Sequence, residues 1–171
     1  MTKSIVFAGG CFWGVEKFFS LIDGVTHTEV AYVNGNTSHP SYKEVCTLNT
    51  GHTEAIKVEY DSTKITLLAL LEFYYKVVDP TSLNKQGNDV GQQYRTGIYS
   101  NDPEDRILVR KSLTQLQKSY KHPIVIEVTT LENYTKAEDY HQDYLNKNPN
   151  GYCHLTQEHF QLASKKKLSD I

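Results

Sequence analysis

The sequence has 171 residues, of which 39% are hydrophobic and 22% charged, and its formal net charge at pH 7 is −2. This length suits one domain with a substantial core, and the composition does not favour a disordered chain. The near-neutral charge, with no basic run other than the lysines at 165–167, argues against a dedicated nucleic-acid or membrane-surface binder.

The N-terminus leads straight into an apolar segment, and no apolar run approaches the length of a membrane span. The three cysteines are odd in number and far apart, which does not suggest a secreted disulfide scaffold. We therefore expect a soluble cytoplasmic protein without a signal peptide.

The predicted elements begin with an apolar strand at 4–8, which turns through Gly9 and Gly10 into a helix that ends near Gly24. A polar, glycine-bearing stretch at 81–93 predicts a long loop, and two Ser/Thr-x-x-Glu capping boxes predict helix starts at Ser41 and Thr135. The further predicted strands are 25–33, 54–60, 95–100 and 124–130, and the further helices are a short one from 41, 66–78, 103–120, one from 135 to about 148, and one from 156.

Up to residue 100 these elements follow the order βαββαβ, which is typical of a ferredoxin-like split βαβ core with an antiparallel sheet and helices on one face. Residues 102–130 add a helix and a strand, and the C-terminal part is rich in coil. We predict an α+β fold in which 1–171 form a single catalytic domain and 148–171 a mobile C-terminal segment.

Cys11 lies where the first strand turns into the first helix. Free backbone N–H groups at a helix start favour a thiolate, and Phe12 and Trp13 place apolar surface beside the sulfur. A free cysteine is, however, more often a small buried hydrophobe, so position alone leaves both interpretations open.

Glu54 opens the strand at 54–60 with the parity of its apolar positions Ile56, Val58 and Tyr60. A carboxyl group that points inward must be paired, hydrogen-bonded or protonated, and a protonated one is a candidate acid. The alternative is a frayed strand end at which Glu54 turns to water.

Four segments resemble the peptide methionine sulfoxide reductase A family in the same order along the chain. They are Gly10-Cys11-Phe12-Trp13-Gly14, residues 41–46, Gly51-His52-Thr53-Glu54, and residues 87–95. The resemblance implies an α+β core with a coil-rich C-terminus, no cofactor or metal, and reduction of the S epimer of methionine sulfoxide, free or in proteins, as a protein-repair activity.

Reduction of a sulfoxide needs a soft nucleophile at sulfur and a proton for oxygen, which Cys11 and Glu54 would supply. The other site residues that the resemblance implies are Tyr42 and Tyr94 for the sulfoxide oxygen, Phe12 and Trp13 for the S-methyl group, and Asp89 for polar groups of the substrate. Asp89 could equally be a turn residue, and most of the 12 tyrosines must serve packing or the surface. His52 could orient Glu54, although a structural role is the more common one for such a histidine.

Attack on the sulfoxide leaves Cys11 as a sulfenic acid, which a second thiol must resolve. Cys46 follows Val45 at the end of a short helix and is interpreted as a buried structural thiol, whereas Cys153 lies in coil that could reach Cys11. Some family members carry two C-terminal cysteines, but here Cys153 is alone after Cys46, so a Cys11–Cys153 disulfide reduced by thioredoxin is the simpler route. A monomer is expected. The absence of a Cys-x-x-Cys pair and the scatter of the 7 histidines make metal binding a poor alternative.

Two other classes of protein would also use these residues. A cysteine hydrolase would pair Cys11 with a histidine base and need no reductant. A non-catalytic module that binds methionine-rich segments through its aromatic side chains would keep binding without Cys11.

Overall fold

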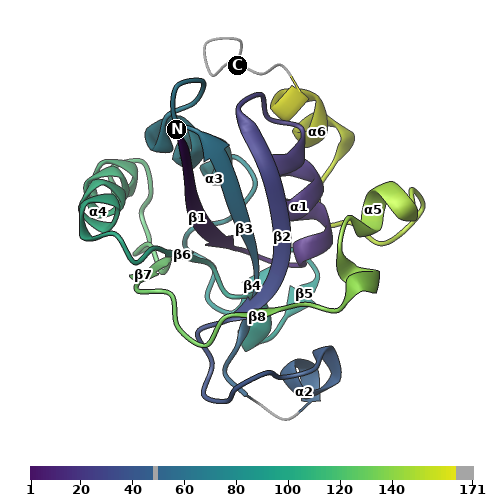
Figure 1. Ribbon diagram of the computed structural model, residues 1–171. Coiled ribbons are helices and arrows are strands. Elements are labelled where there is room, and N and C mark those ends of the chain that lie inside the picture. Colours follow the sequence, from purple (N-terminus) through teal and green to yellow (C-terminus); the bar gives the residue numbers. More distant parts are fainter. Residues whose placement is uncertain (48–49, 165–171) are drawn as a thin grey trace.

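The computed structural model describes residues 1–47 and 50–164, so the lysines at 165–167 and the last residues of the predicted mobile segment lie outside the described part. Strand β1 (Thr2–Ala8) runs through the middle of a six-stranded sheet, between β3 (Thr53–Asp61) and β6 (Gly97–Tyr99) (Figure 1). Strand β2 (Val25–Val33) pairs with the other side of β3. The order β6-β1-β3-β2, with every pair antiparallel, is the predicted split βαβ core.

Helices α1 (Phe12–Ser20) and α3 (Leu67–Tyr75) pack on one face of this sheet. The alternation of side chains decides which residues face them: Phe7 of β1 and Ile56 of β3 lie in the main core with these helices, whereas Ala8 and Ala55 lie on the opposite face. The period of two along the strands therefore separates two apolar clusters.

The predicted additional helix and strand are α4 (Pro103–Gln117) and β7 (Glu127–Thr129). Asp102 caps α4 by accepting a hydrogen bond from the Glu104 N–H at 2.9 Å, with Pro103 in the first turn. Strand β7 pairs with β6 in parallel, so this addition, whose direction the sequence did not predict, makes the extended sheet mixed.

The prediction of a helix that starts at Thr135 was wrong. Thr135 and Lys136 form strand β8 (Thr135–Lys136), which pairs with β2 at the far edge of the sheet. Helical structure resumes only in the short turns η2 (Asp139–His141) and α5 (Tyr144–Lys147). Glu138 accepts hydrogen bonds from Tyr32 and Tyr42 instead of capping, so pairing with distant residues overrides the local signal.

The capping box at Ser41 is confirmed at the start of α2 (Tyr42–Thr47). The Glu44 N–H donates to Ser41 Oγ and the Ser41 N–H donates to Glu44 Oε1, both at 3.1 Å. The stretch predicted as a loop at 81–93 contains the small hairpin of β4 (Lys85–Gln86) and β5 (Asp89–Val90), followed by the turn η1 (Gln92–Tyr94).

The predicted C-terminal helix is α6 (Gln157–Ser164), which packs beside α1 (Figure 1). The segment that leads to α6 thus passes over the start of α1. Within the described residues, no helix combines the length and the apolar character that crossing a bilayer requires.

Candidate active site

Cys11 is the N-cap of α1 and follows directly on the Gly9-Gly10 turn at the end of β1; only 6% of its surface is exposed. Burial and the nearby Glu54 carboxylate raise the pKa of Cys11 well above its usual range, while the Trp13 backbone N–H lowers it. The helix start acts on the sulfur in the expected direction, but burial outweighs it. Cys11 is therefore a thiol in this state, and not the thiolate that its position predicted.

Glu54 confirms its predicted inward orientation from β3: it is 1% exposed, and its Oε1 accepts a hydrogen bond from the Phe12 N–H at 3.1 Å. Glu54 Oε2 has no partner among the described residues. Burial raises the pKa of Glu54 to about 8, and the Phe12 hydrogen bond only partly offsets this. At neutral pH the carboxyl group is thus mostly protonated, and it contacts the residue next to Cys11.

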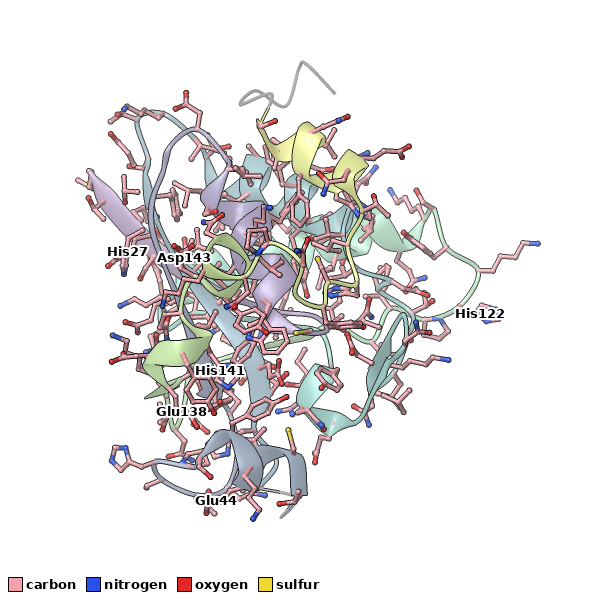
Figure 2. All side chains as sticks on the ribbon, turned by 90° about the vertical axis from the view of Figure 1, so that its right-hand side faces the viewer. His27, Glu44, His122, Glu138, His141 and Asp143 are labelled. Carbon is pink, nitrogen blue, oxygen red and sulfur yellow. The ribbon has the colours of Figure 1, made fainter. Side chains whose placement is uncertain are left out.

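The aromatic side chains that follow Cys11 are held by a histidine. Phe12 is buried against Tyr32 and His141, and Trp13 donates from Nε1 to His141 Nδ1 at 3.0 Å while its ring stacks on Tyr144 at 3.8 Å. Burial lowers the pKa of His141, so its Nδ1 is free to accept. Figure 2 shows His141 and Glu138 between the start of α1 and α2. The sequence did not single out His141, and it assigned Glu138 only to the capping box at Thr135.

Tyr42 from α2 and Tyr94 from η1 both lie near Glu54. Burial raises the pKa of each phenol, and the Glu54 carboxylate raises it further. The Tyr94 carbonyl accepts a hydrogen bond from the Gly10 N–H at 3.1 Å, which ties η1 to the turn before Cys11. The structure thus gathers Cys11, Glu54 and both tyrosines.

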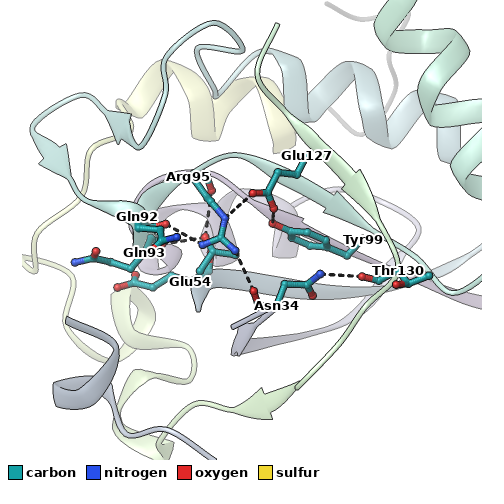
Figure 3. Close-up of polar contacts among 9 residues, drawn as sticks. Asn34, Glu54, Gln92, Gln93, Arg95, Tyr99, Glu127 and Thr130 are labelled. Atoms are coloured by element: carbon teal, nitrogen blue, oxygen red, sulfur yellow. Dashed lines mark hydrogen bonds and ion pairs between the residues drawn. The ribbon is translucent and has the colours of Figure 1, made fainter. Parts of the chain in front are cut away.

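Arg95 holds the backbone behind this group (Figure 3). Its guanidinium donates to Glu127 Oε1 at 2.8 Å, to the Gln92 carbonyl at 3.1 Å and to the Asn34 carbonyl at 3.2 Å. Because these bonds join η1 to β7 and to the residue that follows β2, Arg95 fixes the position of Tyr94. The sequence placed Arg95 in a matching motif but assigned it no role.

The C-terminal segment contacts both Asp89 and the first turn of α1. Asp89 accepts a hydrogen bond from the Tyr152 hydroxyl at 3.0 Å, and Cys153 lies against the first turn of α1, where a Cβ at Gly14 would come within 2.9 Å of its Sγ. Cys153 also contributes to raising the pKa of Cys11, and both cysteines are free. Tyr152 and His154 are contacts of Asp89 that sequence reasoning missed, because neither belongs to a periodic pattern.

Cys46 and His52 lie at the edge of the candidate active site. Cys46 is exposed, so its interpretation as a buried thiol was wrong; on the six-residue helix α2 it is the preceding Val45 that points inward. It lines a cavity of about 150 Å³ together with His52 and Gln93. His52 is buried and its Nδ1 is 2.9 Å from Thr50 Oγ1, a contact that supports a structural role.

Comparisons with known proteins find similar sequences over most of the chain. The family model described as peptide methionine sulfoxide reductase matches residues 3–170. Peptide methionine sulfoxide reductase MsrA from Clostridium perfringens is 59% identical over 153 residues, which cover 90% of this chain and 98% of that protein. The Mycoplasma pneumoniae MsrA is 52% identical over the same shares of the two chains.

Solved structures show the same likeness. Mxr1 from Saccharomyces cerevisiae in reduced form matches with a TM-score of 0.85 and 36% identity, over 89% of this chain and 88% of that one. Methionine sulfoxide reductase A of Corynebacterium diphtheriae matches with a TM-score of 0.83 and 38% identity, over 90% and 78%. Mxr1 has also been solved in complex with Trx2.

Proposed function

This chain belongs to the peptide methionine sulfoxide reductase family and is an oxidoreductase that reduces methionine sulfoxide, and we propose that Cys11 and Glu54 carry out the reduction. The observation that carries the proposal is the hydrogen bond from the Phe12 N–H to Glu54 Oε1 at 3.1 Å. It holds a mostly protonated carboxyl group against the residue adjacent to the only cysteine at the helix start.

In the first step the Cys11 sulfur attacks the sulfoxide sulfur while Glu54 gives its proton to the sulfoxide oxygen. The Glu54 carboxylate then takes the proton of the Cys11 thiol. Both groups start the reaction protonated because the pKa of each is raised. The S–O bond of the substrate then breaks, its hydroxyl oxygen bonds to the Cys11 sulfur, and the bond between the two sulfurs breaks to release the thioether. Cys11 ends as a sulfenic acid, so its sulfur is oxidised by two electrons and the methionine sulfur is reduced by two.

The side chains around Cys11 would orient the substrate. Tyr42 and Tyr94 near Glu54 hold the sulfoxide oxygen, and Phe12 and Trp13 contact the S-methyl group. Because the methyl group and the oxygen of one chiral sulfur are directed to different walls, we propose selectivity for the S epimer. Asp89 binds polar groups of free or protein-bound substrate once Tyr152 has moved away.

Cys153 then condenses with the Cys11 sulfenic acid to a disulfide, which thioredoxin reduces by thiol exchange. The place of Cys153 against Gly14 supports this step, and the complex of Mxr1 with Trx2 supports the reductant. This cycle needs Cys11 and Cys153 to return to free thiols, which suits the reducing cytoplasm, and we propose that the protein acts there as a monomer.

The experiment that tests these roles is a single turnover with each epimer of a methionine sulfoxide peptide and no added reductant. We expect the wild type to form one equivalent of methionine from the S epimer only, with a Cys11–Cys153 linkage by mass spectrometry. Cys11→Ser should form none, because a hydroxyl is a far weaker nucleophile.

Cys153→Ser should still form one equivalent at a near-normal rate, but should cycle only with a small reductant such as dithiothreitol. Cys46→Ser is the matched control and should behave as the wild type does. A Cys11–Cys46 linkage, or normal thioredoxin-driven cycling without Cys153, would contradict the assigned resolving thiol, and equal use of both epimers would contradict the proposed pocket.

A further inference from the structure

His154 is a buried imidazole that the reaction described so far does not use. Its side chain is 6% exposed, and neither ring nitrogen has a hydrogen-bond partner among the described residues. The nearest charged group is Asp89, whose Oδ2 lies 3.9 Å from Nδ1 and has no partner either. A buried polar atom without a partner has lost its hydrogen bonds to water and gained none, so its retention requires an explanation.

The ring contacts the chain on both sides of Cys11. A Cβ at Gly10 would come within 2.9 Å of His154 Nε2, and one at Gly14 within 3.6 Å of His154 Cε1 and 2.9 Å of Cys153 Sγ. Gly10 also has a φ of +76°, where a side chain would be strained. The two glycines thus leave the space in which the imidazole and the Cys153 thiol meet the start of α1 together.

Burial of the ring favours a neutral imidazole. Burial lowers the pKa of His154, and Asp89 opposes this while His159 adds to it. The other titratable groups at this site are Cys11, Glu54, Tyr152 and, near Cys153, Lys17. Burial raises the pKa of Cys153, and its Sγ approaches the same glycine, Gly14, as the His154 ring. A neutral imidazole therefore shares this space with a thiol that must lose its proton before it can attack.

We propose that His154 accepts the proton of the Cys153 thiol during disulfide formation and delivers it to the oxygen of the Cys11 sulfenic acid, with Asp89 holding the ring. The Cys153 sulfur attacks the Cys11 sulfur, the S–S bond forms, and the S–O bond breaks. The oxygen leaves with its own hydrogen and the transferred proton as water, so the step needs no further oxidant or reductant. This role rests on the proposed function and adds the proton transfer of its second half.

The test follows the two halves of one turnover separately. Reduced protein is mixed with a stoichiometric amount of methionine sulfoxide peptide between pH 5 and pH 9, and methionine and the Cys11–Cys153 disulfide are quantified against time. The variants are His154→Asn, His154→Gln and His154→Ala, with and without added imidazole. His122→Asn, at an exposed histidine far from the site (Figure 2), is the control.

We expect the His154 variants to form methionine at near-normal rates but to form the disulfide about 10²-fold more slowly, as is usual for loss of a general base. The wild-type disulfide rate should fall as the pH drops below the His154 pKa, which lies under 6.5. In the variants the rate should instead keep rising towards pH 9, because it then depends on ionisation of Cys153 itself. Imidazole should restore part of the rate of His154→Ala.

Unchanged disulfide formation in the folded variants would overturn the proposal. So would an equal slowing at every pH without rescue by imidazole, because that pattern indicates a structural role. If His154→Asn fails to fold, His154→Gln, which keeps a polar group of similar size, gives the same comparison. If the wild type forms no methionine, it is the proposed function that fails, and the two failures are thus distinguishable.

Discussion

Glu54 and Cys11 are two buried acids whose charged forms disfavour each other. Each pKa is raised first by burial, and the Glu54 carboxylate raises that of Cys11 further. As a result both groups keep their protons at neutral pH, and the Glu54 proton is the one that we propose passes to the substrate oxygen. A carboxyl group at the same position but open to water would be ionised at neutral pH and could not act as an acid.

We expect Glu54→Gln to slow methionine formation by about 10²-fold or more, because glutamine keeps the hydrogen bond to Phe12 but has no proton to transfer. The wild-type rate should fall as the pH rises through about 8, where Glu54 loses the proton that it must donate. Single-turnover rates between pH 6 and pH 10 measure both effects. A wild-type rate that stays flat to pH 10 would contradict the assignment of Glu54 as the acid.

The same carboxyl group links stability to pH. Its pKa is raised from 4.5 in the unfolded reference to about 8 in the folded protein, so its contribution is full below 4.5 and is lost as the pH rises through 8. Thermal melting should show the wild type losing stability relative to Glu54→Gln across this window. Glu59→Gln, on the other face of the same strand, is the control and should parallel the wild type.

Sequence reasoning found the residues that local patterns mark and missed those that distant segments supply. The parity of β3 predicted that Glu54 points inward, and the turn into α1 predicted the place of Cys11. His141 contacts Trp13 across 128 positions of sequence, and no pattern around a single histidine indicates such a partner. Burial of Cys11 was one of two interpretations that its position left open, and the structure shows that it is 6% exposed.

At the scale of elements, the segment from β8 to η2 contacts two residues of the proposed substrate pocket, Trp13 through His141 and Tyr42 through Glu138. Its Glu138 accepts from the Tyr32 hydroxyl at 2.7 Å and from the Tyr42 N–H at 3.0 Å, so it joins β2 to the start of α2. Short strands such as β8, β4 and β5 have too few residues to show a period, and the sequence therefore predicted helix or loop at all three.

We expect Glu138→Gln to raise KM by about tenfold with a smaller effect on kcat. A glutamine side chain has one acceptor oxygen for two donors, and a loss of about 1.4 kcal/mol at the Tyr42 backbone corresponds to that factor. Steady-state kinetics with dithiothreitol separate the two constants. Glu132→Gln, at an exposed position shortly before β8, should leave both constants unchanged. A drop confined to kcat in Glu138→Gln would show that Glu138 does not position Tyr42 for binding.

At the scale of the molecule, the C-terminal segment is attached to the first helix by α6. Phe160 and Ala163 are buried in the main core with residues of α1, and Lys17 lies over the Phe160 ring at 4.8 Å from its centre. The order βαββαβ predicted the four-stranded centre of the sheet. It did not predict that the chain returns to α1. Residues 148–156 show no hydrophobic periodicity, so the sequence does not indicate which element they pack against.

We expect Phe160→Ala to lower the free energy of unfolding by about 3 kcal/mol, the usual cost of removing a buried aromatic ring. It should also slow formation of the Cys11–Cys153 disulfide, since α6 no longer fixes the segment, while the first equivalent of methionine still forms. Urea denaturation and the single-turnover assay measure the two effects. Leu68→Ala, at an exposed position of α3, should change stability by less than about 0.5 kcal/mol.

Stability unaffected by Phe160→Ala would show that α6 is not held to the core. A disulfide rate that stays normal in a destabilised variant would show instead that the segment around Cys153 is positioned without α6.

The central place of β1 has a consequence for how the protein is made. β1 leaves the ribosome first, yet its partners β3 and β6 and the segment that covers Cys11 follow 50 to 150 residues later. At about 5–20 residues per second, Cys11 spends roughly 10–30 s of synthesis without its cover. The thiol that is most shielded in the finished molecule is therefore open to oxidants throughout translation, and each newborn chain depends on the reducing capacity of its surroundings until its last helix docks.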